Sequence, residues 1–187
     1  MPMVKAPLTI EHGLLGFVRQ QPLHGYEIAQ RLRATEELGL SWGWKQSQVY
    51  AELLHLEQEG YLTSEVETQA TRPPRKVFRL TATGDAAFEA WIASPVPHGR
   101  DFQLEFPAKL YFAQQEGGDA ARALVSRQQE ACHAWLAGLR SQEPQHEAGQ
   151  DYARLVQQFR VSQIETILAW LATCAKQLGA ERGAGVA

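Results

Sequence analysis

The sequence predicts a mainly α-helical protein in which a small α+β domain precedes an all-α domain. Two runs with strand character, at 61–69 and 75–81, lie among segments whose apolar residues recur at helical spacing. After the Pro/Gly-rich stretch SPVPHG at 94–99, every remaining segment has helical periodicity. We therefore expect an N-terminal domain at 1–93, a hinge at 94–101, a helical domain at 102–180 and a disordered tail at 181–187.

Composition sets the class of protein. With 44% hydrophobic and 21% charged residues, the chain of 187 residues is typical of a folded globular protein. No apolar run approaches the ~18 residues that span a membrane, and the N-terminus lacks the apolar core of a signal peptide. Cys132 and Cys174 form neither a disulfide framework nor a metal-binding spacing. We expect a cytoplasmic protein without metal or cofactor, whose thiols are buried and unreactive; a thiol sensor is the alternative.

The first domain is expected to hold four helices. The first two span 8–20, ending before Pro22, and 24–34, in which Tyr26, Ile28, Ala29 and Leu32 face inward. A connector at 35–45 follows. The third helix lies between Ser47, its expected N-cap, and Gly60, its C′ residue. The fourth covers 82–94 and is capped by Thr81 or Thr83.

The second domain is expected to contain helices at 102–116, 119–142 and 148–178. The last of these carries a long apolar stripe, which we expect to be too extensive for one subunit to bury alone. A purely intrachain core is the alternative.

Helix, helix, connector, helix and hairpin, in that order, predict a winged helix-turn-helix domain. In this motif the N-terminal residues of the second helix contact base edges in the major groove of DNA. Here that helix begins KQSQVY. Gln can bond adenine in a bidentate way, and Ser is permissive. The residues predicted to contact DNA from this helix are Lys45, through a phosphate, and Gln46, Ser47, Gln48 and Tyr50. In the alternative interpretation, Ser47 only caps the helix and the glutamines are solvated.

The predicted hairpin carries a cluster of cations in TRPPRKVFRL, although the chain has a net charge of −3. Arg72, Arg75 and Lys76 lie at or beside the turn, where they would neutralise phosphates on the flank of a duplex. The first 80 residues have no net charge, so binding to nucleic acid depends on this local patch. An idle charged turn is the alternative.

Three sequence blocks carry a family resemblance: LHGYEIAQRL, SQVYAELLHLEQEGYL and PPRKVFRLTATGDAAFEAWI. Together they resemble the PadR family of bacterial transcriptional regulators, with Gly25–Ile28 matching its GYEI segment. Tyr26 of this segment joins the residues predicted to contact DNA. Ala51 stands where the family has proline after the tyrosine, and Phe78 where the wing has tyrosine. Neither departure threatens the fold, since Ala favours a helix and Phe packs like Tyr.

The resemblance extends beyond the hinge. DFQLEFPAKLYFAQQ and SQIETILAWL are similar to the C-terminal helical domain of the longer family members, including the phenolic-acid repressor. It implies a homodimer built through these helices, which would place two recognition helices about one DNA turn apart on a pseudo-palindrome. It also implies a repressor that a small aromatic effector releases from double-stranded DNA.

Aromatic and cationic residues in the second half are consistent with such an effector pocket between the domains. A carboxylate would need a cation, for which Lys109, His133, Arg154 and Arg160 are candidates. The predicted effector-binding residues are Trp91, Phe106, Lys109, Tyr111, Trp135, Tyr152 and Arg154. Aromatic residues at helical spacing are more often core, which is the alternative. We expect an effector to shift the dimer between two conformations.

Other classes of protein are less consistent with the sequence. No Gly-rich phosphate loop, HExxH motif or nucleophile elbow is present, so we do not expect an enzyme. A winged-helix module that binds another protein would not need the three cations of the hairpin. A small-molecule carrier would leave the polar start of the third helix unexplained. We therefore predict a dimeric, sequence-specific DNA-binding regulator, with a protein-interaction module as the main alternative.

Overall fold

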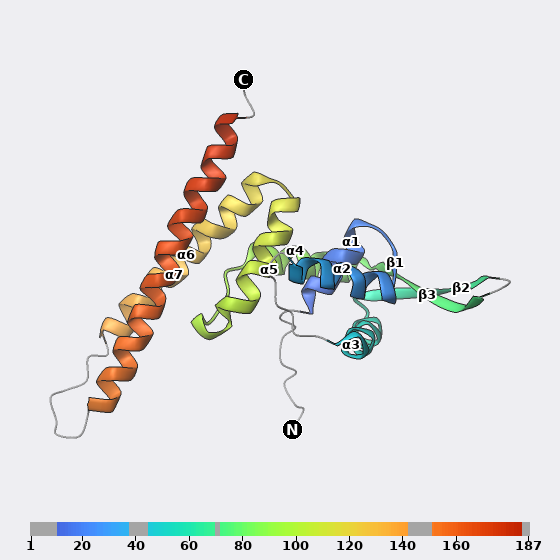
Figure 1. The fold of residues 1–187 in the computed structure, drawn as a ribbon, viewed down its shortest axis with the longest axis horizontal. Helices are drawn as coiled ribbons and strands as arrows, with labels where there is room; N and C mark the ends of the chain where they lie inside the picture. The colour runs from blue at the N-terminus through green and yellow to red at the C-terminus, as the bar shows by residue number, and fades with distance from the viewer. Residues whose placement is uncertain (1–10, 38–44, 70–71, 142–150, 185–187) are drawn as a thin grey trace. The chain divides into compact units, whose positions relative to one another are not determined.

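The computed structural model describes residues 11–37, 45–69, 72–141 and 151–184 (Figure 1). Its contacts divide the chain into two compact units. The N-terminal unit comprises Met1–Ile92 and Pro107–Phe112, and the C-terminal unit comprises Ala93–Phe106 and Ala113–Ala187. Each unit has buried apolar residues of its own. The predicted helical residues 8–10 and most of the predicted connector, 38–44, lie outside the described residues.

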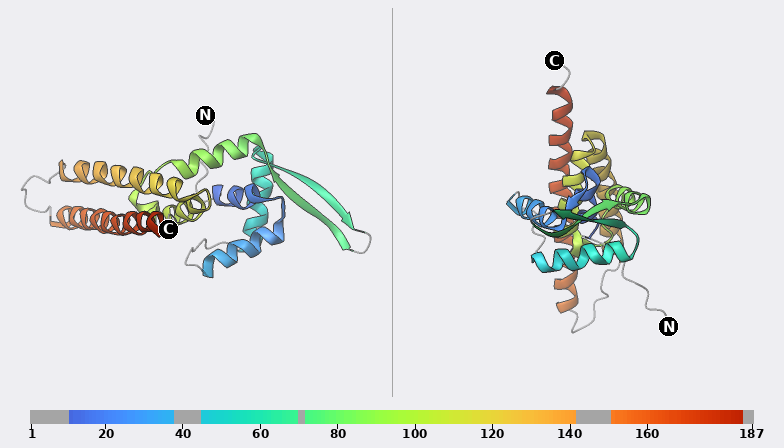
Figure 2. Two further views of the ribbon diagram at one scale, coloured as in Figure 1. Left: turned by 90° about the horizontal axis from the view of Figure 1, so that it is seen from above. Right: turned by 90° about the vertical axis from the view of Figure 1, so that its right-hand side faces the viewer.

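The N-terminal unit combines helices with an antiparallel sheet. Its elements are α1 (His12–Gln20), β1 (Leu23–His24), α2 (Gly25–Glu37), α3 (Gln46–Gln58), β2 (Leu62–Gln69), β3 (Arg72–Leu80) and α4 (Ala82–Ala93). The strand order is β1-β3-β2, so β3 is central. β2 and β3 form a long hairpin that projects beyond the helices of this unit, as Figure 2 shows.

Strand β1 was not predicted, because two residues are too few to show alternation of apolar and polar side chains. Leu23 pairs with Phe78, and His24 pairs with Val77 of β3. This pairing attaches the segment just before α2 to the hairpin. It therefore places the first turn of α2 beside the part of the β2–β3 hairpin that contains Val77 and Phe78.

The core of the N-terminal unit is built from the apolar faces that the sequence predicts. Its members include Leu14, Leu15, Phe17, Ile28, Leu32, Leu53, Leu56, Phe78, Phe88 and Trp91. Phe112 packs edge-on against Phe17, with ring centroids 5.2 Å apart, and against Phe88 at 5.4 Å. Pro107–Phe112 therefore belongs to this unit, whereas the expected second domain began at 102.

The start of α4 decides between the two predicted caps. The Thr81 hydroxyl accepts the backbone N–H of Gly84 at 3.0 Å, so Thr81 is the cap and Thr83 is not. The same hydroxyl lies 2.7 Å from the carbonyl of Gly60 and 3.1 Å from that of Tyr61. These bonds fasten the end of the hairpin to the turn after α3.

The C-terminal unit contains a 3-10 turn, η1 (Gly99–Asp101), both ends of α5 (Phe102–Gln115), α6 (Gly118–Ser141) and α7 (Asp151–Ala184), whereas the middle of α5, Pro107–Phe112, belongs to the N-terminal unit. α6 and α7 run antiparallel and side by side, as Figure 2 shows. The apolar residues buried in these two helices include Leu124, Cys132, Leu136, Ile164, Leu171 and Cys174. Burial raises the pKa of both cysteine thiols, which favours the unreactive protonated form.

Helix α7 is longer than predicted. Residues 181–184, which we expected in a disordered tail, continue the helix, because the stretch after Asp151 contains no proline and Glu181 and Arg182 favour helix. Residues 185–187 lie outside the described part. Among the described residues, no helix combines the length and the apolar character that crossing a membrane requires.

The expected hinge is held in place within the C-terminal unit. The side-chain oxygen of Gln128 accepts the backbone N–H of Val96 at 2.7 Å, and its nitrogen lies 3.5 Å from the Val96 carbonyl. Arg127 donates to the Ala93 carbonyl at 2.9 Å. Val96 and Gln128 are both fully buried, so this part of the stretch packs against α6.

Candidate nucleic-acid interface

Polar side chains surround the first turn of α3. Lys45 occupies the N-cap position, and its backbone N–H donates to the side-chain oxygen of Gln48 at 2.8 Å. The backbone N–H of Gln48 donates in turn to the Lys45 carbonyl at 2.9 Å. Ser47 is therefore not the cap, contrary to our expectation, because it is already the second residue of the helix, and the bonds between Lys45 and Gln48 form the start of α3. The side chains of Gln46 and Ser47 are both exposed.

Tyr26 lies on the outside of α2, with 41% of its surface exposed, and does not face inward as the helical pattern suggested. Its ring stacks on His24, with centroids 5.8 Å apart. The guanidinium of Arg75 stands 5.3 Å from the centre of the same ring. On this outer face the ring contacts a residue of β1 and a cation of β3, and the helical spacing of apolar residues in the sequence shows neither contact.

Lys76 has a different environment from its neighbour Arg75. Its ammonium lies 3.0 Å from a carboxylate oxygen of Glu57, near the end of α3. The other oxygen of Glu57 accepts the Ser64 hydroxyl at 2.5 Å. The bond from Ser64, and after it the bond from Lys76, lower the pKa of Glu57. Within the predicted cluster, Arg75 therefore contacts an aromatic ring and Lys76 pairs with an acid.

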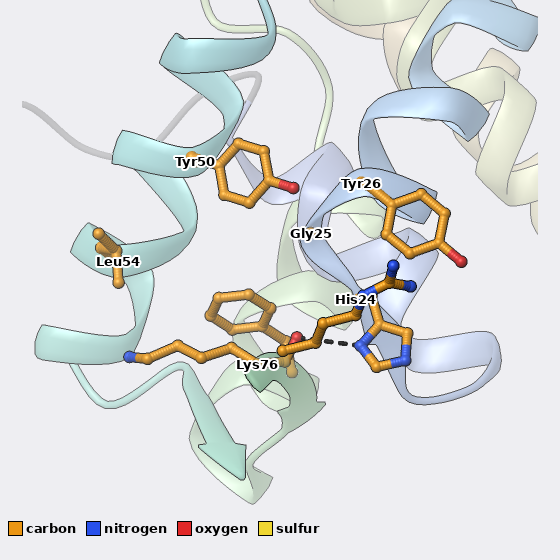
Figure 3. A pocket seen from close by; sticks show the side chains of 8 residues that line it. His24, Gly25, Tyr26, Tyr50, Leu54 and Lys76 are labelled. Atoms are coloured by element: carbon orange, nitrogen blue, oxygen red, sulfur yellow. Dashed lines mark hydrogen bonds between the residues drawn. The ribbon is translucent and has the colours of Figure 1, made fainter. Parts of the chain in front are cut away.

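These residues surround a concavity of about 560 Å³ between α2, α3 and β3 (Figure 3). It is lined by His24, Gly25, Tyr26, Tyr50, Leu54, Arg75, Lys76 and Phe78. Gly25 leaves room for the Tyr50 ring, since a Cβ on Gly25 would lie 2.5 Å from it. Four of the residues predicted to contact DNA thus meet at one place: Tyr26, Tyr50, Arg75 and Lys76.

The other predicted DNA contacts lie nearby in the same elements. Lys45, Gln46, Ser47 and Gln48 form the exposed start of α3, the helix that carries Tyr50. Arg72 begins β3 and pairs with Gln69 of β2. Sequence reasoning missed His24 as part of this surface, and the only signal for it was its position next to GYEI.

The residues predicted to bind an effector are divided between the two units. Trp91, Lys109 and Tyr111 belong to the N-terminal unit, where Lys109 is 1% exposed and its ammonium lies 5.5 Å from the centre of the Trp91 ring. In the C-terminal unit, Phe106 is buried and stacks on Phe102 at 4.8 Å. These aromatic residues fill the interiors of their units.

A groove of about 470 Å³ lies entirely within the C-terminal unit. It is lined by Pro97, His98, Gly99, Arg100, Trp135, Gly138, Leu139, Arg160, Gln163 and Ile164. Trp135 is the predicted effector residue found here, and Arg160 was a candidate cation. Tyr152 and Arg154 are exposed in the first turn of α7 and do not line this groove.

A helical domain with a three-stranded sheet, a projecting hairpin and an exposed polar helix start is a winged helix-turn-helix domain. Residues 14–90 match the model of the transcriptional regulator PadR-like family, and residues 104–179 match that of the virulence activator alpha C-terminal region. The chain is 31% identical over 125 residues to the negative transcriptional regulator PadR of Bacillus subtilis. The matched region covers 65% of this chain and 68% of that relative. The chain therefore belongs to the PadR-like family of transcriptional regulators, which confirms the predicted family and fold class.

The chain is also similar to a second curated protein and to solved structures. A probable transcriptional regulator of Mycobacterium tuberculosis is 28% identical over 89 residues, covering 48% of this chain and 46% of that one. Bacillus subtilis PadR has been solved in complex with operator DNA, with 26% identity, coverage of 90% of this chain and 98% of that chain, and a TM-score of 0.44. It has also been solved with p-coumaric acid, with 26% identity, coverage of 91% and 98%, and a TM-score of 0.40.

Proposed function

We propose that this regulator is a homodimeric repressor that reads a pseudo-palindromic operator, with α3 in the major groove and the β2–β3 hairpin along the phosphate backbone. The observation that carries the proposal is the exposed start of α3, with Gln46 and Ser47, in the same helix whose Tyr50 shares a concavity with Arg75. Amide and hydroxyl groups at this position suit base edges. Lys45 and Arg75 supply charge for phosphates on either side.

The exposed face of α7 supports the dimer. Tyr152, Leu155, Phe159 and Trp170 share one side of this helix and are 79%, 64%, 66% and 41% exposed, respectively. A stripe of large apolar side chains usually marks a protein interaction surface. A second copy of the chain is the occupant we propose, because a two-fold dimer gives two α3 helices about 34–36 Å apart, the spacing of successive major grooves.

Binding to a selected operator tests this proposal. From a random duplex library, the full chain is expected to select a sequence with two inverted half-sites. Fluorescence anisotropy on that duplex should give a Kd at least about a thousandfold lower than on a scrambled duplex of equal length. Failure to select any sequence, or equal affinity for the selected and the scrambled duplex, would favour the protein-interaction module instead.

We further propose that a small aromatic acid regulates the repressor through the groove of the C-terminal unit. Trp135 offers a face for an aromatic ring, and Arg100 and Arg160 offer charge for a carboxylate. p-Coumaric acid is the natural first probe, since a relative has been solved with it.

Two arginines of α7 make a matched pair for the effector test. Arg160 lines the groove and Arg154 does not. Arg160→Ala is expected to weaken binding of p-coumaric acid at least about tenfold by isothermal titration, whereas Arg154→Ala binds it like the wild type. Both variants should retain operator affinity without the acid. An effect of Arg154→Ala alone would place the site at the start of α7, and no effect of either would argue against this groove.

A further inference from the structure

Glu57 connects three elements of the DNA-reading surface through one carboxylate. It lies in the last turn of α3, its Oε1 accepts the Ser64 hydroxyl of β2 at 2.5 Å, and its Oε2 accepts the Lys76 ammonium of β3 at 3.0 Å. Both oxygens are therefore engaged by the two strands of the wing.

The electrostatics at this end of α3 require a cation. The C-terminal end of a helix carries partial negative charge, so a carboxylate there is unfavourable unless a positive group offsets it. Lys76 provides that charge, and Glu57 is only 26% exposed. On the same hairpin, Arg79 and Glu65 form a looser pair at 3.5 Å that is 48% and 72% exposed. That second pair is an ordinary surface ion pair.

Lys76 is held at its backbone as well as at its side chain. Its carbonyl lies 3.3 Å from Nδ1 of His24 in β1, and its side chain runs toward α3 (Figure 3). The neighbouring Arg75 leaves the strand in another direction and reaches the Tyr26 ring. The two adjacent cations thus have separate partners, one an acid and the other an aromatic ring.

We propose that Glu57 is a positioning residue that holds the wing, which is the β2–β3 hairpin, against the recognition helix α3. We call its bonds to Ser64 and Lys76 the lock. Lys76 then serves this lock and does not bind a phosphate. The lock sets the angle between the element that reads bases and the element that grips the backbone. Of the two neighbouring cations Arg75 and Lys76, Arg75 is then the one that binds a phosphate. The inference rests on the proposed DNA-binding function and assigns different roles to two neighbouring cations within it.

The substitution Glu57→Gln distinguishes the two possible roles of Lys76, a phosphate contact or a partner of Glu57, because they predict opposite changes in operator affinity. Glu57→Gln removes a negative charge near DNA. If Lys76 bound a phosphate, this change would release it and tighten binding. If Glu57 is a lock, the same change weakens operator binding, by about fivefold or more. Glu65→Gln makes the same charge change in the looser pair and is the matched control, expected to leave affinity unchanged or slightly higher.

Lys76→Met adds the second criterion, measured as the dependence of log Kd on log salt by anisotropy with the full chain. A lost phosphate contact would lower the slope by about 0.9 per protomer. We expect Lys76→Met to weaken operator binding without this change in slope. The double variant Glu57→Gln/Lys76→Met should bind the operator no more weakly than the weaker-binding single variant. Tighter binding by Glu57→Gln, or a slope lowered by about 1.8 in the dimer by Lys76→Met, would overturn the lock.

Thermal unfolding without DNA distinguishes failure of the lock from failure of the proposed function. If the lock exists, the Tm of the double variant falls by no more than the larger of the decreases seen with Glu57→Gln or Lys76→Met alone, because both substitutions remove the same interaction. This result would hold even if no operator were found. Additive losses of Tm would overturn the lock while leaving DNA binding itself untouched.

Discussion

Arg75→Ala is expected to weaken operator binding by at least about tenfold and to lower the salt slope by about 1.8 for the dimer. The guanidinium stands over the Tyr26 ring, which holds it in one place before DNA arrives and reduces the entropy lost on binding. Each protomer would lose one phosphate contact, and each contact contributes about 0.9 to the slope. Anisotropy on the selected operator at several salt concentrations measures both quantities.

Arg79→Ala is the control for this prediction. Arg79 lies on the same strand, and its side chain pairs with Glu65. Its loss changes the net charge equally but removes no proposed DNA contact, so affinity should fall by less than about threefold. Equal losses for the two variants would mean that the wing acts only through its overall charge.

Gly84→Ala is expected to destabilise the fold by about 3 kcal/mol or more, the upper range for overpacking a core. A Cβ on Gly84 would lie 2.1 Å from the backbone oxygen of Tyr61 and 2.8 Å from Leu80. The Tyr61 oxygen also accepts the backbone N–H of Thr81 at 3.1 Å, so it cannot move without breaking the junction between β2 and β3. The Tm should fall by about 6–12 °C.

Gly138→Ala is the matched control, since it places the same methyl group in another helix. Among the described residues, and apart from the adjoining residues and the backbone of its own helix, no atom lies within 4 Å of the position that a Cβ on Gly138 would take. The substitution should leave stability unchanged or raise it by up to about 1 kcal/mol, because alanine favours helix over glycine. Thermal unfolding of both variants checks the pair. Similar losses of Tm in the two would show that the cost does not come from the contact with Tyr61.

Local sequence signals sufficed for most of the elements. Apolar spacing predicted α2, α3 and α4 to within a few residues, and Gly60, with φ of 79°, follows the end of α3 as expected for a C′ residue. The cap of α3 was misplaced because Ser47 has a strong intrinsic preference for that role. The competing bond between Lys45 and Gln48 depends on side-chain reach and is invisible in propensities.

The candidate site was predictable as a set of residues but not as a geometry. Tyr26, Tyr50 and Arg75 come from three elements and meet in one concavity, which the order of elements predicted only in outline. The aromatic residues nominated for an effector divide between the units, since periodicity cannot distinguish a core ring from a pocket wall. Arg100 of the groove carried no signal because it lies in a short 3-10 turn.

By itself, the sequence determined the family, the order of helices and strands, and the polar start of α3, because each depends on residues close together in the chain. Only the tertiary structure decided how Arg75 and Lys76 are used. Their partners, Tyr26 and Glu57, lie on two different helices, and neighbouring side chains on a strand leave it in different directions. A run of three cations in the sequence is therefore compatible with several arrangements, and long-range packing selects one of them.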